Sequence, residues 1–253
     1  MVRFSLENLE LRYEPFPIGC AQPIMDAQTY TSLVDSFPAE DLFVSLPKVG
    51  HKYVLSEKFN ERGYHQFIRS QPEWRELHRW IKSEDFIESV MESLHERYVD
   101  LGYGELLSPG RRFLRSLVGK SGRGSLKLGT HRLNARFEFS MLPSDGGHVR
   151  PHTDTPAKLI TLVVAMLRPG DWQPEFGGGT DVNRPKDVRQ TFNLLNRKAG
   201  FDEMEVLHTY PFVPNQAIVF VKTFNSWHSV QPMTGHGRRT MRKTLTINIE
   251  TRR

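Results

Sequence analysis

The stretch RPHTDTP, residues 150–156, places His152 and Asp154 one residue apart. In an extended strand, residues i and i+2 point to the same side, so this spacing would present an imidazole and a carboxylate together. A third metal ligand would have to come from another segment. His228, which follows the apolar run QAIVFVKTF, is the candidate. Two histidines and one carboxylate form the facial triad of non-haem Fe(II) oxygenases, which leaves coordination positions open.

An H-x-D pair alone is a weak signal, because Asp154 could equally cap a turn. The order of the surrounding segments strengthens it. After H-x-D come apolar strands, a Gly-rich turn, an apolar strand that ends near His228, and a last strand that carries arginine. This order predicts that the metal ligands lie on neighbouring strands of one β-structure.

The segments that must position these ligands read as short strands from about residue 131 onward. HRLNARFEFSML alternates polar and apolar residues, and KLITLVVAML, VLHTYPFV, QAIVFVKTF and RKTLTINIE follow. Clusters rich in Gly and Pro separate them, such as PSDGG and VPNQ. Short strands with such turns are typical of an antiparallel sandwich or barrel.

The first hundred residues show mainly helical spacing of apolar residues, including one long helix or two helices joined near Ser83. We therefore expect a single domain over residues 1–253. Residues 1–105 form a mainly helical support, 106–130 a basic Gly-rich loop, and 131–253 the β core. The expected fold class is mainly β with flanking helices (α+β), with the N-terminal helices packed outside the β core.

Composition limits which disulfides, partners and cellular compartments we expect for the protein. The chain carries a net charge of +5, and Cys20 is its single cysteine, so no intramolecular disulfide can form. Residues 106–137 contain eight Lys or Arg residues and no acidic one. A solvated basic loop is the simpler explanation, and a site for phosphate, carboxylate or nucleic acid is the alternative. No apolar run is long enough to span a membrane, and the N-terminus does not resemble a secretory signal. We expect a cytoplasmic protein.

Four motifs resemble those of the Fe(II)/2-oxoglutarate-dependent oxygenase superfamily, nearest to its prolyl-hydroxylase-like branch. They are PHTD at 151–154, FGGGT at 176–180, WHSVQP at 227–232 and RKTLT at 242–246, and they cover roughly the C-terminal half. The resemblance implies a double-stranded β-helix, which is a jelly-roll, cupin-like barrel. It also implies that His152, Asp154 and His228 bind iron. The activity implied is oxidation of a substrate C–H by O₂, with conversion of 2-oxoglutarate to succinate and CO₂.

The distal carboxylate of 2-oxoglutarate would need a cation, for which a bidentate arginine is best suited. In RKTLTINIE, Leu245 lies on an apolar face, whereas Arg242 and Thr244 lie on the polar face that suits a cosubstrate pocket. We therefore expect Arg242 to anchor the cosubstrate and Thr244 to add a hydrogen bond. Arg238 is the alternative, because it lies closer to the spacing from His228 that is common in the superfamily.

The substrate is not encoded in any motif that we can read. The leading hypothesis is hydroxylation of a small or medium metabolite, which the net charge suggests is anionic. Alternatives are a peptide or protein hydroxylase, a nucleic-acid demethylase, and a barrel that binds ligands without turnover. Alkylation-repair relatives carry a second arginine six positions after the anchor; Asn248 stands there, which argues against nucleic acid as the substrate. The sequence leaves the oligomeric state open.

Overall fold

The computed structural model describes residues 2–101 and 133–251 of the chain. Within these ranges the chain forms twelve β-strands and four α-helices, so the protein is mainly β with a helical share, as predicted. The predicted basic loop, residues 106–130, lies outside the described residues. In the described part, no helix combines the length and the apolar character needed to cross a bilayer.

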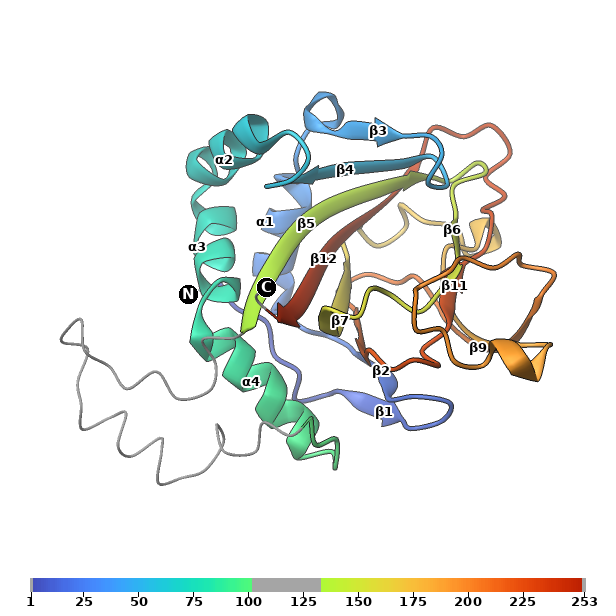
Figure 1. Ribbon diagram of the computed structural model, residues 1–253. Helices are drawn as coiled ribbons and strands as arrows, with labels where there is room; N and C mark the ends of the chain where they lie inside the picture. Colours follow the sequence, from blue (N-terminus) through green and yellow to red (C-terminus); the bar gives the residue numbers. More distant parts are fainter. Residues whose placement is uncertain (1, 102–132, 252–253) are drawn as a thin grey trace, which may run out of the picture.

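An eight-stranded antiparallel sheet forms the centre of the molecule (Figure 1). Its strands, in spatial order, are β1 (Glu10–Arg12), β2 (Ile18–Ala21), β10 (Ala217–Val221), β7 (Lys158–Ala165), β12 (Met241–Thr251), β5 (Leu133–Pro143), β4 (Lys52–Ser56) and β3 (Val44–Leu46). Strand β12 is paired with β5 from Met241↔Pro143 to Thr251↔Leu133, and with β7 on its other side.

A four-stranded antiparallel sheet packs against the large one. It consists of β6 (Val149–His152), β11 (His228–Val230), β8 (Thr180–Pro185) and β9 (Met204–Tyr210). Two apolar clusters join the sheets. One contains Phe220 of the large sheet with Val182 and Tyr210 of the small sheet, and the other contains Leu142 with Val230. The two sheets are therefore held together by apolar contacts in two separate regions.

Four helices lie on the N-terminal side of the chain: α1 (Ala27–Asp35), α2 (Glu61–Ser70), α3 (Pro72–Ile81) and α4 (Glu84–His95). Helices α2, α3 and α4 contact β4 or β5, on the side of the large sheet that faces away from the small one (Figure 1). Of the two alternatives expected for this region, one long helix or two helices joined near Ser83, the structure shows two helices. Ser83 is the N-cap of α4, and its hydroxyl accepts a hydrogen bond from the amide of Phe86 at 3.3 Å.

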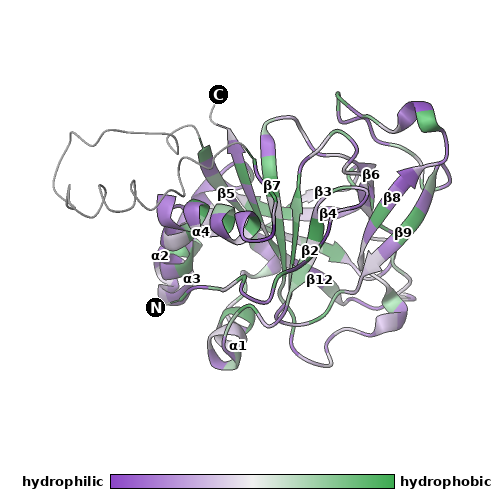
Figure 2. Cartoon of the chain, turned by 90° about the horizontal axis from the view of Figure 1, so that it is seen from below, coloured by the Kyte–Doolittle hydropathy of each residue, from purple (hydrophilic) through white to green (hydrophobic). Residues whose placement is uncertain are grey.

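The main apolar core lies between these helices and the large sheet. Leu245, Ile247 and Ile249 of β12 are fully buried in it, which confirms the apolar face predicted for this strand. Trp74 of α3 meets Phe139 of β5 edge-on, with ring centroids 4.9 Å apart. Figure 2 shows the same division: hydrophobic residues colour the central strands, and hydrophilic residues colour much of the outer surface of the helices.

The first hundred residues also contain four strands that the helical prediction overlooked. Strands β1 and β2 extend the large sheet beyond β10, and β4 and β3 extend it beyond β5. Each is only three to five residues long, too short for its side-chain alternation to stand out against the helical pattern around it. The N-terminal part therefore both covers the large sheet and supplies its edge strands.

Candidate metal centre

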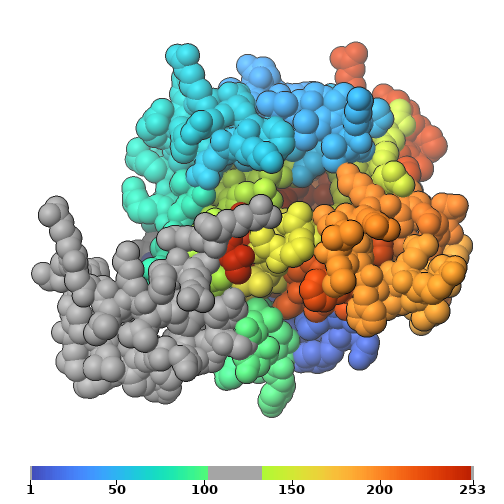
Figure 3. Space-filling view, in the orientation of Figure 1, coloured from blue at the N-terminus to red at the C-terminus, as the bar shows by residue number. Residues whose placement is uncertain are grey.

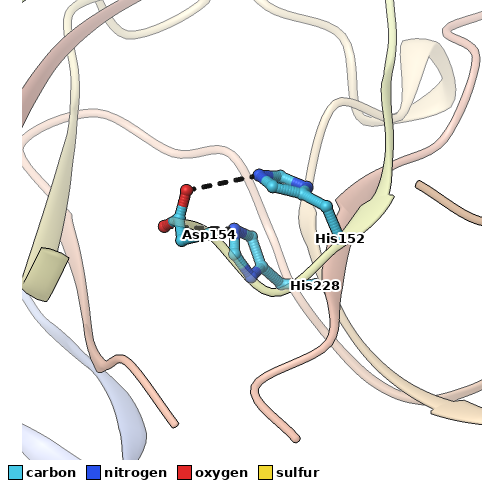
Figure 4. A group of neighbouring side chains, drawn as sticks. All are labelled: His152, Asp154 and His228. Carbon is cyan, nitrogen blue, oxygen red and sulfur yellow. Dashed lines mark ion pairs between the residues drawn. The ribbon is translucent and has the colours of Figure 1, made fainter. Parts of the chain in front are cut away.

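The structure brings the three predicted metal ligands together. One ligand atom from each of His152, Asp154 and His228 can be chosen so that all lie within 4.8 Å of one another. Nε2 of His152 is 3.5 Å from Oδ1 of Asp154, and Nε2 of His228 is 3.9 Å from Oδ2. Figure 4 shows both imidazoles turned toward the carboxylate.

The small sheet positions the two histidines. His152 is the last residue of β6, His228 is the first residue of β11, and the two are direct partners in the antiparallel register. Asp154 is placed differently from the prediction. It lies beyond the end of β6 with φ of 67°, so a left-handed turn, not strand alternation, brings its carboxylate beside the imidazoles. Aspartate tolerates this conformation better than most residues.

The ring orientation of each histidine is fixed by the backbone in the same way. Nδ1 of His152 lies 2.9 Å from the carbonyl oxygen of Arg150, and Nδ1 of His228 lies 2.9 Å from that of Ser226. A carbonyl accepts only, so each Nδ1 carries the proton and donates it. The Nε2 lone pair is then left free toward Asp154, which is the arrangement that metal-binding histidines use.

The protonation states of His228 and Asp154 suit the binding of a metal cation. Burial is the main cause that lowers the pKa of His228 to about 3, so this ring is neutral near pH 7. Burial opposes ionisation of Asp154, but the ammonium of Lys158 and the two imidazoles outweigh it and hold the pKa of this carboxyl well below its usual range. A neutral imidazole and an ionised carboxylate are the forms that ligate metals.

Two residues beside the triad were not predicted from the sequence. Lys158 Nζ donates to Oδ1 of Asp154 at 2.6 Å, and the hydroxyl of Thr161 lies 3.3 Å from Oδ2. Both come from β7, so the large sheet fixes a carboxylate that belongs to the loop after β6. Lys158 and Thr161 lie only four and seven residues beyond Asp154, but no motif signals these contacts, because they depend on the left-handed turn at Asp154.

Arg242, the predicted cosubstrate anchor, is 5% exposed and lies on the inner face of β12. Its Nε donates to the carbonyl oxygen of Gly178 at 2.6 Å, and its guanidinium lies 4.4 Å from the ring centre of Phe212. Among the described residues it forms no ion pair with a carboxylate. Burial lowers its pKa to about 10, so it is still charged at neutral pH. A buried, unpaired cation is costly, and an anionic ligand would offset this cost.

The other two predicted cosubstrate residues differ in their placement. Thr244 is buried, and its hydroxyl lies 2.8 Å from that of Ser140 on the neighbouring strand. Arg238 is exposed in the turn before β12, where its guanidinium lies 5.6 Å from the ring centre of Phe176. Arg242 and Thr244 thus share the interior with the triad, and Arg238 lies at the surface.

The structure explains why the FGGGT motif has a glycine at position 178. Gly178 adopts φ of 82°, and a Cβ at this position would come within 2.9 Å of the Trp172 ring, 3.0 Å of the Met233 sulfur and 3.3 Å of Arg242 Cδ. Any larger residue would therefore displace the side chains around the guanidinium. The motif was visible in the sequence, but its contact with Arg242 required the structure.

Searches for similar proteins found no matching family profile and no matching curated protein. Several solved structures align over nearly the whole chain. A prolyl-4-hydroxylase from Pseudomonas putida is 13% identical, with 93% of this chain and 92% of that chain covered and a TM-score of 0.47. A 2OG-Fe(II) oxygenase family oxidoreductase from Burkholderia pseudomallei is 12% identical, with 92% and 84% covered and a TM-score of 0.43.

The epimerase SnoN, solved with Fe³⁺, alpha ketoglutarate and nogalamycin RO, is 12% identical, with 92% of this chain and 78% of that chain covered and a TM-score of 0.48. These neighbours have names from the superfamily whose motifs the sequence resembles. Because the identities are low and the TM-scores are below 0.5, the function of this chain has to be inferred from its own residues and their geometry.

Proposed function

We propose that the protein is an Fe(II)- and 2-oxoglutarate-dependent dioxygenase that hydroxylates an unactivated C–H bond of a small or medium metabolite. The observation that carries this proposal is the triad of His152, Asp154 and His228, with both Nε2 atoms facing an ionised carboxylate. Two imidazoles and one carboxylate suit Fe(II), and they leave positions for a chelating cosubstrate and for O₂.

The strand order supports a jelly-roll barrel of the double-stranded β-helix type. From β5 to β12, the chain crosses repeatedly between the two sheets: β5, β7, β10 and β12 join the large sheet, and β6, β8, β9 and β11 join the small one. In this fold the ligands occupy the space between the sheets. That placement agrees with histidines on β6 and β11, an aspartate in the loop after β6 and an arginine on β12.

Arg242 would anchor 2-oxoglutarate, with the hydroxyl of Thr244 nearby. Its buried charge, which has no carboxylate partner in the described residues, matches the distal carboxylate of a dicarboxylic acid. Arg238 fits this role less well because it is exposed to solvent, which would screen its charge.

The side chains around the triad would hold the reacting groups in order. The backbone carbonyls of Arg150 and Ser226 fix the imidazoles, and Lys158 and Thr161 hold one oxygen each of Asp154. When bound, iron with 2-oxoglutarate and O₂ would supply the oxidising chemistry, releasing succinate and CO₂. The chain itself would bind, orient and exclude water.

The proposal can be tested with purified protein, Fe(II), ascorbate, O₂ and 2-oxoglutarate, with a panel of metabolites as substrates. We expect the wild type to bind about one equivalent of Fe(II) and to release succinate. We expect His228→Ala to lose both, whereas His65→Ala, on helix α2, serves as the matched control and keeps both. Succinate release by His228→Ala at the wild-type rate would refute the triad. Metal binding without succinate release from any substrate would instead indicate a non-catalytic barrel.

A further inference from the structure

Four large apolar side chains protrude from one short segment between β8 and β9. They are Val188, Phe192, Leu194 and Leu195, and each is between 58% and 80% exposed. A single exposed apolar side chain is normal on a protein surface, but a group of them marks an interaction site. None of the four takes part in the candidate metal centre. We call residues 188–195 the apolar turn.

Hydrogen bonds fix the backbone of the apolar turn at several points. The side chain of Asn193 binds the backbone of Arg197 twice, since Nδ2 donates to the carbonyl oxygen and Oδ1 accepts from the amide, both at 2.8 Å. The amide of Asn193 donates to the carbonyl oxygen of Phe224 at 2.7 Å, and the indole of Trp227 donates to that of Thr191 at 3.0 Å. A backbone that is already fixed loses little conformational entropy when a partner binds.

The apolar turn is bonded directly to the metal-binding segment. Thr153, which stands between His152 and Asp154, makes the connection. Its amide donates to Oδ1 of Asn196, and its hydroxyl donates to the carbonyl oxygen of Asn193, each at 3.2 Å. In Figure 3 the segment before β9, in orange, borders a hollow at whose bottom β12 is visible. A partner that binds the apolar turn would therefore lie beside the metal centre.

The way these side chains are displayed distinguishes between kinds of partner. A small molecule requires a concave site that buries most of its surface. A protein partner would need a surface shaped to the turn, with closely packed pockets for the anchoring side chains. A lipid surface needs no such match, because its fluid head groups and acyl chains rearrange around the Phe and Leu side chains that enter them. Side chains that protrude to this degree therefore favour a lipid surface.

The charges beside the apolar turn favour anionic lipids. Asp187 is the one acidic residue within residues 186–198, and it is paired with Arg189 at 2.9 Å. The next carboxylates follow at residues 202–205, where Glu205 is paired with Arg184. Basic residues held near an anionic lipid surface add to binding, and salt weakens their contribution. Residues 186–198 contain four of them: Lys186, Arg189, Arg197 and Lys198.

We propose that the apolar turn docks the protein onto an anionic lipid surface. Phe192, Leu194 and Leu195 would enter the boundary between head groups and acyl chains, while Arg197 and Lys198 would stay at the level of the head groups. Because Thr153 joins the turn to the metal-binding segment, docking would hold the metal centre close to the lipid. This role goes beyond the function proposed above and does not depend on it.

Vesicle binding by the metal-free protein tests the proposal. Vesicles of phosphatidylcholine, alone or mixed with phosphatidylglycerol, are sedimented with each protein. The variants are Leu194→Ser/Leu195→Ser and Arg197→Gln/Lys198→Gln. Tyr98→Ser, at an exposed ring beyond the end of α4, is the matched control. Fluorescence of Phe192→Trp and Tyr98→Trp reports which position enters the lipid, and thermal melting shows that every variant folds.

We expect the wild type to bind the mixed vesicles. Leu194→Ser/Leu195→Ser should weaken this binding at least about tenfold, because two apolar side chains no longer enter the lipid. Arg197→Gln/Lys198→Gln should weaken binding to the mixed vesicles about tenfold or more and leave binding to phosphatidylcholine alone within about twofold. Tyr98→Ser should bind as the wild type does. Emission of Phe192→Trp should shift to shorter wavelength with vesicles, and that of Tyr98→Trp should not.

Three results would overturn the proposal. The first is a wild type that does not sediment with the mixed vesicles. The second is a folded Leu194→Ser/Leu195→Ser variant that binds them as tightly as the wild type. The third is a wild-type oligomer in analytical ultracentrifugation that the same variant converts to monomers while vesicle binding is unchanged, since the apolar turn would then contact a second copy of the chain.

Discussion

The two faces of strands β5 and β12 are buried to a similar degree but differ in chemistry. On the face toward the helices, Phe139, Leu245 and Ile247 are fully buried among aromatic and aliphatic side chains. On the face toward the small sheet, Arg242 and Asn248 are at most 5% exposed. One pair of strands therefore serves as the wall of an apolar core on one side and of a polar site on the other.

This difference between the faces suggests that one side of the sheet mainly stabilises the fold and the other mainly serves binding. We call the face toward the helices the outer face and the face toward the small sheet the inner face. Apolar burial on the outer face stabilises the fold by about 1.5–3 kcal/mol for each large side chain. The inner face carries a buried cation, Arg242, which forms no ion pair with a carboxylate among the described residues and therefore opposes folding. Substitutions on the outer face should therefore change stability, and substitutions on the inner face should change binding.

The largest expected effect comes from removing a ligand on the inner side. We expect His152→Ala to abolish metal binding and turnover, because two ligands hold a metal ion far less tightly than three. The free energy of unfolding of the metal-free protein should change by less than about 1 kcal/mol, since His152 is not part of the apolar core. Metal titration and urea unfolding check the two parts. A large loss of stability in the metal-free variant would contradict the separation of the two faces.

The second effect concerns the outer face. Phe139→Ala removes a fully buried ring that packs against Trp74 and Phe137, and we expect it to lower the free energy of unfolding by about 3–5 kcal/mol. Phe192→Ala, at a ring that is 71% exposed, is the control and should cost less than about 0.5 kcal/mol. Urea unfolding measures both. Equal effects of the two changes would show that the helix-covered core is not what stabilises the protein.

A smaller effect should follow removal of the buried cation. Arg242→Met keeps the approximate length of the side chain but removes the charge, so 2-oxoglutarate should bind about ten- to a hundredfold more weakly. The ligand-free protein should be as stable as the wild type or more so, because a buried unpaired charge is gone. Arg238→Met should change the affinity by less than about twofold. If Arg238→Met shows the large effect instead, the assignment of the anchor is wrong.

The smallest expected effect is a pH dependence of stability, caused by a titratable group among the helices that cover the outer face. Burial lowers the pKa of His78, in α3, to about 4 from its ordinary value of 6.5. Below about pH 6.5 the unfolded chain takes up a proton here that the folded chain does not. The free energy of unfolding should therefore fall by at most about 1.4 kcal/mol per pH unit between about pH 6.5 and pH 4. His78→Gln should reduce this slope relative to the wild type in urea unfolding measured at each pH; identical slopes would contradict the prediction.

The sequence predicted those features that have a long period or a recognisable motif. The alternation in β5 and β12 identified both strands and separated Arg242 from Leu245 on opposite faces, because side-chain direction in a long strand follows directly from position. Motif spacing identified the three residues that meet at the candidate metal centre. The helical region of α3 and α4 was also predicted, with a break at Ser83 as one of two alternatives.

Other features depend on contacts between distant segments, which no local pattern encodes. Strands β1 to β4 are too short to show alternation, and their pairing partners lie far along the chain. The left-handed backbone of Asp154 replaced the strand geometry that the H-x-D spacing predicted. Phe212 became part of the site only when the loops and the two sheets were placed in space, and Lys158, four residues after Asp154, only when the turn at Asp154 was known.

The pairing of β2 with β10 has a consequence for the order in which the protein can fold. Ile18 is the register partner of Phe220, so about two hundred residues must be synthesised between them before the large sheet can be completed at this edge. Contacts so distant in sequence slow folding, because a long loop has to close before they form. The emerging N-terminal segment can form its helices early, but it gains its place in the sheet only when the last strands have left the ribosome.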